Sequence, residues 1–122
     1  MQRNVSVGIS PDVSRFFLNR NCEEGITYVY SVTSLIRYHL KNLQLEAQVD
    51  AFYSPTYKTV AIFVNFDEPF MDAQTQQQTK NLIDAYVKVG IANLEKEFEF
   101  RKMRRLRLTI PIVYAFCRKI VY

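Results

Sequence analysis

Apolar residues recur at every second position over residues 43–52, and a period of two is typical of a β-strand with one buried and one hydrated face. A Ser-Pro-Thr turn at 54–56 separates this run from a second alternating run at 57–66. Two such runs joined by a short turn predict a β-hairpin. Shorter alternating runs at 5–9 and 106–114 predict two further strands.

Other stretches repeat their apolar residues every three to four positions, which is the period of an α-helix. Ser10 followed by Pro11 predicts the beginning of a short helix, with the serine as its cap. Residues 26–42 predict a second helix, although the β-branched residues in its first turns also suit a strand. Residues 72–100 predict a long third helix whose first turns are polar on all sides.

The order of these elements predicts an α+β fold with a small antiparallel sheet and its two main helices on one face. Strand, helix, strand, strand, helix, strand is the split βαβ order of ferredoxin-like domains. Pro111 favours an edge position for the last strand, because proline cannot donate a hydrogen bond to a neighbouring strand. The alternative is a mainly helical assembly subunit in which residues 101–122 form a helix or an extended arm.

Length indicates a single domain over residues 1–122, because 122 residues are near the commonest domain size. Within it, 101–122 is the expected interaction element. Whether 101–107 continues the long helix or belongs to a strand stays open at this point.

Composition removes several classes of protein from consideration. No run approaches the roughly 20 apolar residues that cross a bilayer, and the first ten residues contain no apolar signal-peptide core. We therefore expect an intracellular protein that does not associate with membranes. Cys22 and Cys117 are then expected to be buried free thiols, with a single disulfide between them as the alternative.

No group of residues indicates an enzyme, and we expect none; a small enzyme is the least supported alternative. The three glycines are isolated, so there is no glycine-rich phosphate-binding loop, and no cofactor is expected. One histidine and two cysteines are too few and too scattered for a zinc site, so no metal is expected. His39 lies on the apolar stripe of the helix predicted at 26–42, which favours a hydrogen-bonded, partly buried histidine over a ligand or a base.

Charge is distributed very unevenly along the chain. Residues 1–100 carry nine Lys or Arg and twelve Asp or Glu, a net charge of −3, whereas residues 101–122 carry seven Lys or Arg and no acid, a net charge of +7. On a strand, Arg105 and Arg107 would point away from the apolar face and could contact phosphates from an open sheet face. The same cations would also suit an acidic protein partner, or a solvated helix end. The candidate binding residues of this segment are Arg101, Lys102, Arg104, Arg105, Arg107, Arg118 and Lys119.

Aromatic residues supply three further candidates for partner or nucleic-acid binding. Phe63 begins a Phe-Val-Asn-Phe stretch that resembles the second half of the RNA-recognition-motif signature, whose aromatics stack on bases. The residues before it depart from that signature, which favours a core strand as the alternative. Tyr114 and Tyr122 belong to a tail, 110–122, that is apolar and aromatic up to its last residue. Such a tail forms either the last strand of the sheet or a surface buried against another chain.

As a whole, the chain resembles small structural proteins of large insect DNA viruses, in particular the small nucleocapsid proteins of baculoviruses. The resemblance is carried by a compact basic chain rich in Tyr, Phe, Asn and Gln, with stretches such as VNFDEPFMDAQ and FEFRKMRRLRLTIPIVYAFCRKIVY. It implies a subunit of a multi-protein capsid or nucleocapsid complex in the host nucleus and the virion. Its partners would be other structural subunits, in a homo- or hetero-oligomer.

The first hypothesis is therefore a non-enzymatic assembly subunit that binds other structural proteins through its C-terminal segment. The alternative is a small nucleic-acid-binding domain that uses a basic, partly aromatic sheet face.

Overall fold

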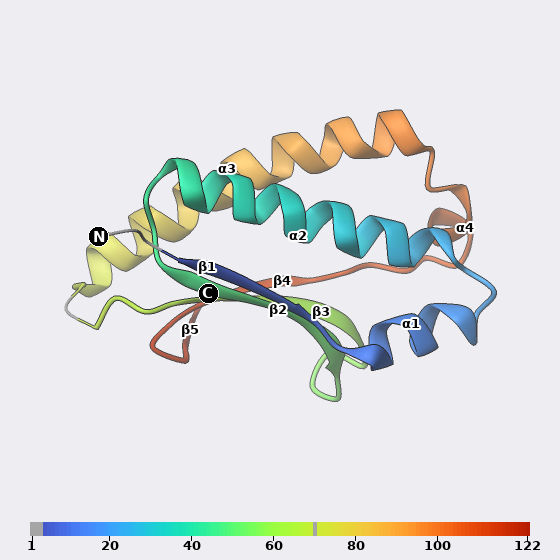
Figure 1. The fold of residues 1–122 in the computed structure, drawn as a ribbon, viewed down its shortest axis with the longest axis horizontal. Helices are drawn as coiled ribbons and strands as arrows, with labels where there is room; N and C mark the ends of the chain where they lie inside the picture. Colours follow the sequence, from blue (N-terminus) through green and yellow to red (C-terminus); the bar gives the residue numbers. More distant parts are fainter. Residues whose placement is uncertain (1–3, 70) are drawn as a thin grey trace.

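The structure is a computed structural model that describes residues 4–69 and 71–122. Its elements follow one another in an α+β order, with strands and helices mixed along the chain (Figure 1). They are β1 (Val5–Ile9), α1 (Pro11–Leu18), α2 (Glu24–Asn42), β2 (Ala47–Ser54), β3 (Thr59–Phe66), α3 (Ala73–Phe98), α4 (Arg101–Arg105), β4 (Ile112–Phe116) and β5 (Lys119–Val121).

The strands form one mixed sheet in which they lie side by side in the order β1-β2-β3-β4-β5. β1 runs parallel to β2, and β3 runs parallel to β4, whereas β2–β3 and β4–β5 are antiparallel pairs. The hairpin predicted from the alternating runs is confirmed as β2–β3. Ala47, Val49 and Ala51 are buried while Gln48 and Asp50 between them are exposed, as a period of two requires.

The α+β class is confirmed, whereas the ferredoxin-like order is not, and the mainly helical alternative is not supported. A split βαβ sheet is antiparallel, with its first strand between the third and the fourth, but here strand order follows chain order. Both helical connections, β1 to β2 and β3 to β4, lie on one face of the sheet (Figure 1). Each connection leads one strand further across the sheet in the same direction. β1 and β3 run in opposite directions, so the two crossover connections have opposite handedness. One of them therefore departs from the right-handed rule for such connections.

The core lies between the helices and the inner face of the sheet. Its central side chains, all without solvent exposure, are Val13, Phe17, Val29, Val32, Ile36, Leu40, Val49, Ile62, Val64, Phe66, Ile83 and Val87. The α1 helix predicted to begin after Ser10 is confirmed, although the Ser10 side chain makes no capping hydrogen bond. The helix predicted at 26–42 is confirmed as α2, so the strand alternative for its first turns is wrong.

The long helices α2 and α3 pack closely against each other. A Cβ at Gly90 of α3 would collide with the Leu35 side chain of α2, so this glycine permits the close approach. Nearby, the half-buried ring of His39 stacks on Tyr86, with 5.2 Å between ring centroids. The partial burial expected of this histidine is confirmed.

The strand predicted at 106–114 is wrong in its first half. The long helix α3 ends at Phe98, and Glu99 takes a left-handed conformation (φ 47°) that lets the separate short helix α4 begin. Phe100 and Met103 are buried and hold α4 in place, so the alternating leucines at 106 and 108 lie in a turn and a loop.

β4 lies between β3 and β5, so the edge position predicted from Pro111 is also wrong. Pro111 stands just before the strand, and its carbonyl accepts a hydrogen bond from the Ile62 N–H (2.9 Å). The missing N–H of the proline falls before the first residue of β4, so it removes no hydrogen bond from the strand itself.

Both cysteines are free, but only Cys22 is buried. The expectation that Cys117 is buried is wrong, because this residue occupies the two-residue turn between β4 and β5. No helix in the described part of the chain is long and apolar enough to cross a membrane.

Candidate protein-binding groove

The residues predicted to bind a partner do not form one site. Five cations, Arg101, Lys102, Arg104, Arg105 and Arg107, lie in and just after α4 at one end of the sheet. Arg118 and Lys119 lie at the β4–β5 turn, at the opposite end of the molecule (Figure 1). Phe63 is on the outer face of the sheet, Tyr114 is on the face covered by helices, and Tyr122 is 88% exposed.

Two carboxylates contact α4. Arg101 forms an exposed ion pair with Glu99 (2.9 Å). The backbone N–H of Met103 donates to a Glu24 carboxylate oxygen, which ties α4 to the beginning of α2. Arg105 ends α4 and Arg107 follows it, so neither residue belongs to a strand from which it could project off a sheet face.

The outer face of the sheet is not a basic aromatic surface. Phe63 stacks on Phe52 of the neighbouring strand, with 5.0 Å between ring centroids. The residues that share this face with it include Gln48, Asp50 and Asn65, none of which is a cation. The aromatic candidate and the basic candidates are therefore on different parts of the molecule.

A groove of about 420 Å³ opens between α3 and the strands β4 and β5; we call it the α3–β4 groove. Its polar side chains come mainly from α3, and its floor and far wall are mostly apolar. It is lined by Tyr57, Lys80, Asp84, Lys88, Ile91, Ile110, Ile112, Val113, Tyr114, Ile120, Val121 and Tyr122.

Strand register explains why Tyr114 forms the floor of this groove. Ile112, Tyr114 and Phe116 alternate onto the inner face of β4, and Tyr114 pairs with Val64 of β3. α3 buries only Ile83 and Val87 among its described residues, so it does not press flat against β4. The long tyrosine side chain spans the remaining space.

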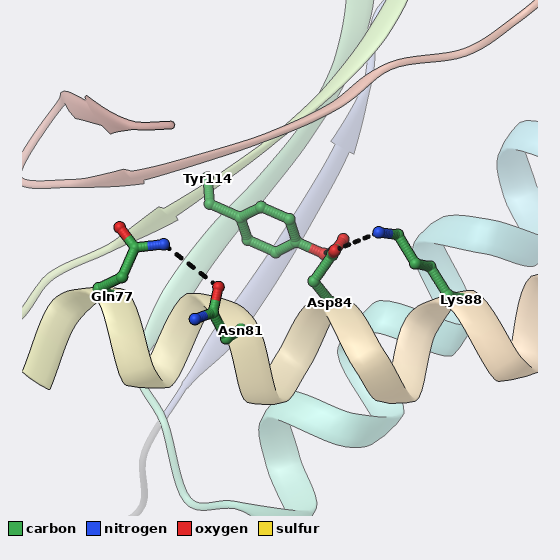
Figure 2. Close-up of polar contacts among 5 residues, drawn as sticks. All are labelled: Gln77, Asn81, Asp84, Lys88 and Tyr114. Carbon is green, nitrogen blue, oxygen red and sulfur yellow. Dashed lines mark hydrogen bonds and ion pairs between the residues drawn. The ribbon is translucent and has the colours of Figure 1, made fainter.

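A row of three polar side chains connects β4 to α3 (Figure 2). The Tyr114 hydroxyl donates to Oδ1 of Asp84 at 3.2 Å, and Nζ of Lys88 lies 2.8 Å from Oδ2 of the same carboxylate. Burial, followed by the nearby Asp84 charge and this hydrogen bond, raises the pKa of Tyr114 far above its ordinary value. The hydrogen bond and charge of Asp84 raise the pKa of Lys88.

Sequence reasoning named Tyr114 as a candidate but missed Asp84 and Lys88. The two missed residues have an i, i+4 spacing on one helix face, which favours an acid–lysine pair but does not by itself indicate a binding site. Gln77 and Asn81 form a second polar pair at the same spacing, 3.2 Å apart, earlier on the same helix (Figure 2).

Three polar side chains of the groove already bind one another. The Tyr114 phenol stays neutral and already donates to Asp84, and that carboxylate already holds Lys88. Among the described residues that line the groove there is no Ser, Cys or His. Among all the residues that the structure describes, no three His, Cys, Asp or Glu side chains lie together as a metal site would require.

No protein-family model, curated protein or solved structure matches this chain. Its function must therefore be inferred from its own residues.

Proposed function

We propose that the chain is a non-enzymatic assembly subunit that binds another structural protein through the α3–β4 groove. The observation that carries the proposal is an apolar groove with a cationic rim. Apolar side chains of α3, β4 and β5 line this groove together, and contiguous apolar surface of this kind marks protein interaction sites.

The partner segment that fits the groove is apolar and carries carboxylates. Ile91, Ile112 and Val121 offer an apolar surface to its side chains. Lys80 and Lys88 outnumber Asp84 in charge, so an acidic group at the rim is favoured. Burial of the apolar anchors supplies the affinity, while the lysines orient the segment and raise its association rate.

The resemblance to small nucleocapsid proteins of baculoviruses supports the same kind of role. Under this proposal the partner is another virion structural protein, and the complex assembles in the host nucleus. In this proposal the acidic partner contacts Lys80 and Lys88 of α3, whereas the sequence led us to expect it at the basic segment 101–122.

The test is a selection of random displayed peptides on the purified full-length chain. We expect the recovered peptides to combine apolar residues with Asp or Glu. We expect them to lose binding at least about tenfold on the double variant Lys80→Glu/Lys88→Glu, through reversed rim charge. Lys96→Glu is the control, because it reverses one charge on an exposed lysine of the same helix, outside the groove. Peptides without acidic residues, or equal binding to all three proteins, would disprove this function.

A further inference from the structure

The outer edge of β1 carries unpaired backbone groups. The carbonyl of Asn4 accepts from Ala47 N–H (3.3 Å), and the Ser10 N–H donates to the carbonyl of Ala51 (2.9 Å). Successive residues of a strand point their backbone groups to alternate sides, so the even-numbered residues face β2. The N–H and C=O groups of Val5, Val7 and Ile9 therefore point away from the sheet. Within the part of the chain that the structure describes, no strand pairs with this edge.

β1 has none of the usual features that protect an edge strand. Its sequence, VSVGI, contains no charge and no proline. The opposite edge differs, because β5 has only three residues and contains Lys119 next to Arg118. Short edge strands and lysines are the common means of blocking strand addition. The unprotected edge is therefore β1.

A second copy of the same chain can pair with the unpaired backbone groups of this edge, so no different protein is needed. In an antiparallel pair centred on Val7, Val5 faces Ile9 of a second copy, and the two Val7 residues face each other. All three pairs are then of the kind that exchange two hydrogen bonds, because each of these residues points its N–H and C=O outward. We propose that two copies of this chain associate through antiparallel pairing of their β1 strands, which joins two five-stranded sheets into one.

Exposed apolar side chains flank this edge on the side covered by helices. Val7 is 38% exposed, and Tyr30 of α2 is 54% exposed. Tyr30 precedes His39 by nine residues, or about two and a half helical turns, so it lies on the opposite side of α2. His39 faces α3, so Tyr30 points away from α3, toward the β1 edge. Antiparallel pairing brings the two α2 helices together and buries both side chains.

This association is independent of the proposed function. The α3–β4 groove lies at the β4–β5 end of the sheet, so a dimer through β1 leaves both grooves open. A chain that dimerises without binding acidic peptides, or binds them as a monomer, would separate the two proposals.

The test is the mass of the full-length chain in solution, measured by sedimentation equilibrium over a range of concentrations. We expect a dimer, and we expect Val7→Pro to weaken it about 10- to 100-fold by removing the N–H donor of Val7 from both copies. Proline is tolerated on an edge strand where the lost N–H served no partner within the fold. Val7→Lys is the second variant, because it blocks the same edge without changing the backbone.

Val89→Lys is the matched control, since it changes a valine that is 65% exposed on α3. We expect this variant to dimerise like the unmodified chain. A monomer at roughly 100 µM, or a dimer that both Val7 variants leave unchanged, would overturn the proposal. If Val7→Pro does not fold, Val7→Lys decides on its own.

Discussion

At the scale of single residues, the backbone carries strain at several turns. Among the described residues, positive φ angles occur at non-glycine positions, and no glycine has one. A side chain in the left-handed region costs about 1 kcal/mol relative to glycine. The residues concerned are Asn21, Gln44, Lys58, Glu99, Arg107, Cys117 and Arg118.

The tightest of these turns allows a stabilising substitution. Cys117 (φ 47°) and Arg118 (φ 69°) form the two-residue turn between β4 and β5, where glycine is strongly preferred at the second position. We expect Arg118→Gly to raise the free energy of unfolding by about 1 kcal/mol, measured by urea denaturation. The substitution keeps the backbone N–H that donates to Asn65 (2.8 Å). Lys119→Gly, within β5, should lower stability instead; an equal effect of both glycines would contradict this explanation.

The buried Tyr114 and the half-buried Tyr28 predict sensitivity to alkali. Burial raises the pKa of Tyr28 and Tyr114 above the ordinary value of about 10. Above that pH the unfolded chain loses both protons while the folded chain keeps them, so the free energy of unfolding falls as pH rises. Tyr114→Phe should weaken this fall between about pH 9.5 and 11.5, and should cost about 1 kcal/mol at neutral pH through the lost hydrogen bond. Tyr122→Phe, at an exposed tyrosine, should change neither quantity in the same denaturation series.

At the scale of elements, Gly25 fixes how α1 docks on α2. A Cβ at this position would overlap the ring of Phe17, which has no solvent exposure and cannot move aside. We expect Gly25→Ala to lower the free energy of unfolding by about 2 kcal/mol, although alanine is the better helix former. Ser34→Ala, at an exposed position of the same helix, should be neutral or slightly stabilising. Thermal unfolding followed by circular dichroism measures both, and a stabilised Gly25→Ala would show that Phe17 can repack.

Elements with a clear local period could be predicted from the sequence. The hairpin β2–β3 and the helices α2 and α3 depend on apolar spacings of two or of three to four residues, and such a spacing is visible within the short segment that forms the element. The break at Glu99 could not be predicted in this way, because the buried contacts of Phe100 and Met103 decide it. The order of the strands in the sheet could not be predicted either, because it depends on how the two helical connections pack on one face of the sheet.

The groove was predicted only in part for the same reason. Tyr114 stands out as an aromatic residue in an alternating run, so it could be named as a candidate. Its partner Asp84 lies 30 residues earlier, and only the position of α3 over β4 brings the two together. An acid and a lysine four residues apart occur on many helices, so spacing alone could not single out Asp84 and Lys88.

At the scale of the whole molecule, the basic residues are divided between two ends. Arg118 and Lys119 lie far from the five cations in and after α4 (Figure 1). A DNA duplex docked at the α4 end therefore meets at most five of these cations. We expect log Kobs to fall against log salt with a slope no steeper than about −4.5, at about −0.9 per phosphate.

Fluorescence anisotropy of labelled duplex DNA at several salt concentrations measures this slope. Arg104→Glu/Arg105→Glu should reduce its magnitude by about 2, whereas Arg118→Glu should leave it unchanged. A slope steeper than about −6 would show that both ends contact the same DNA.

The strands lie in the sheet in the order in which they follow one another along the chain, and this has a consequence for synthesis on the ribosome. No strand has to insert between two that are already paired, so the sheet can grow one strand at a time as the nascent chain emerges. Once residue 66 has appeared, β1, β2 and β3 can already be paired, while β4 is still about 46 residues away along the chain. During that interval β3 presents a long apolar edge with no partner. Chaperone capture of stalled chains that end between β3 and β4 would report on this exposed intermediate.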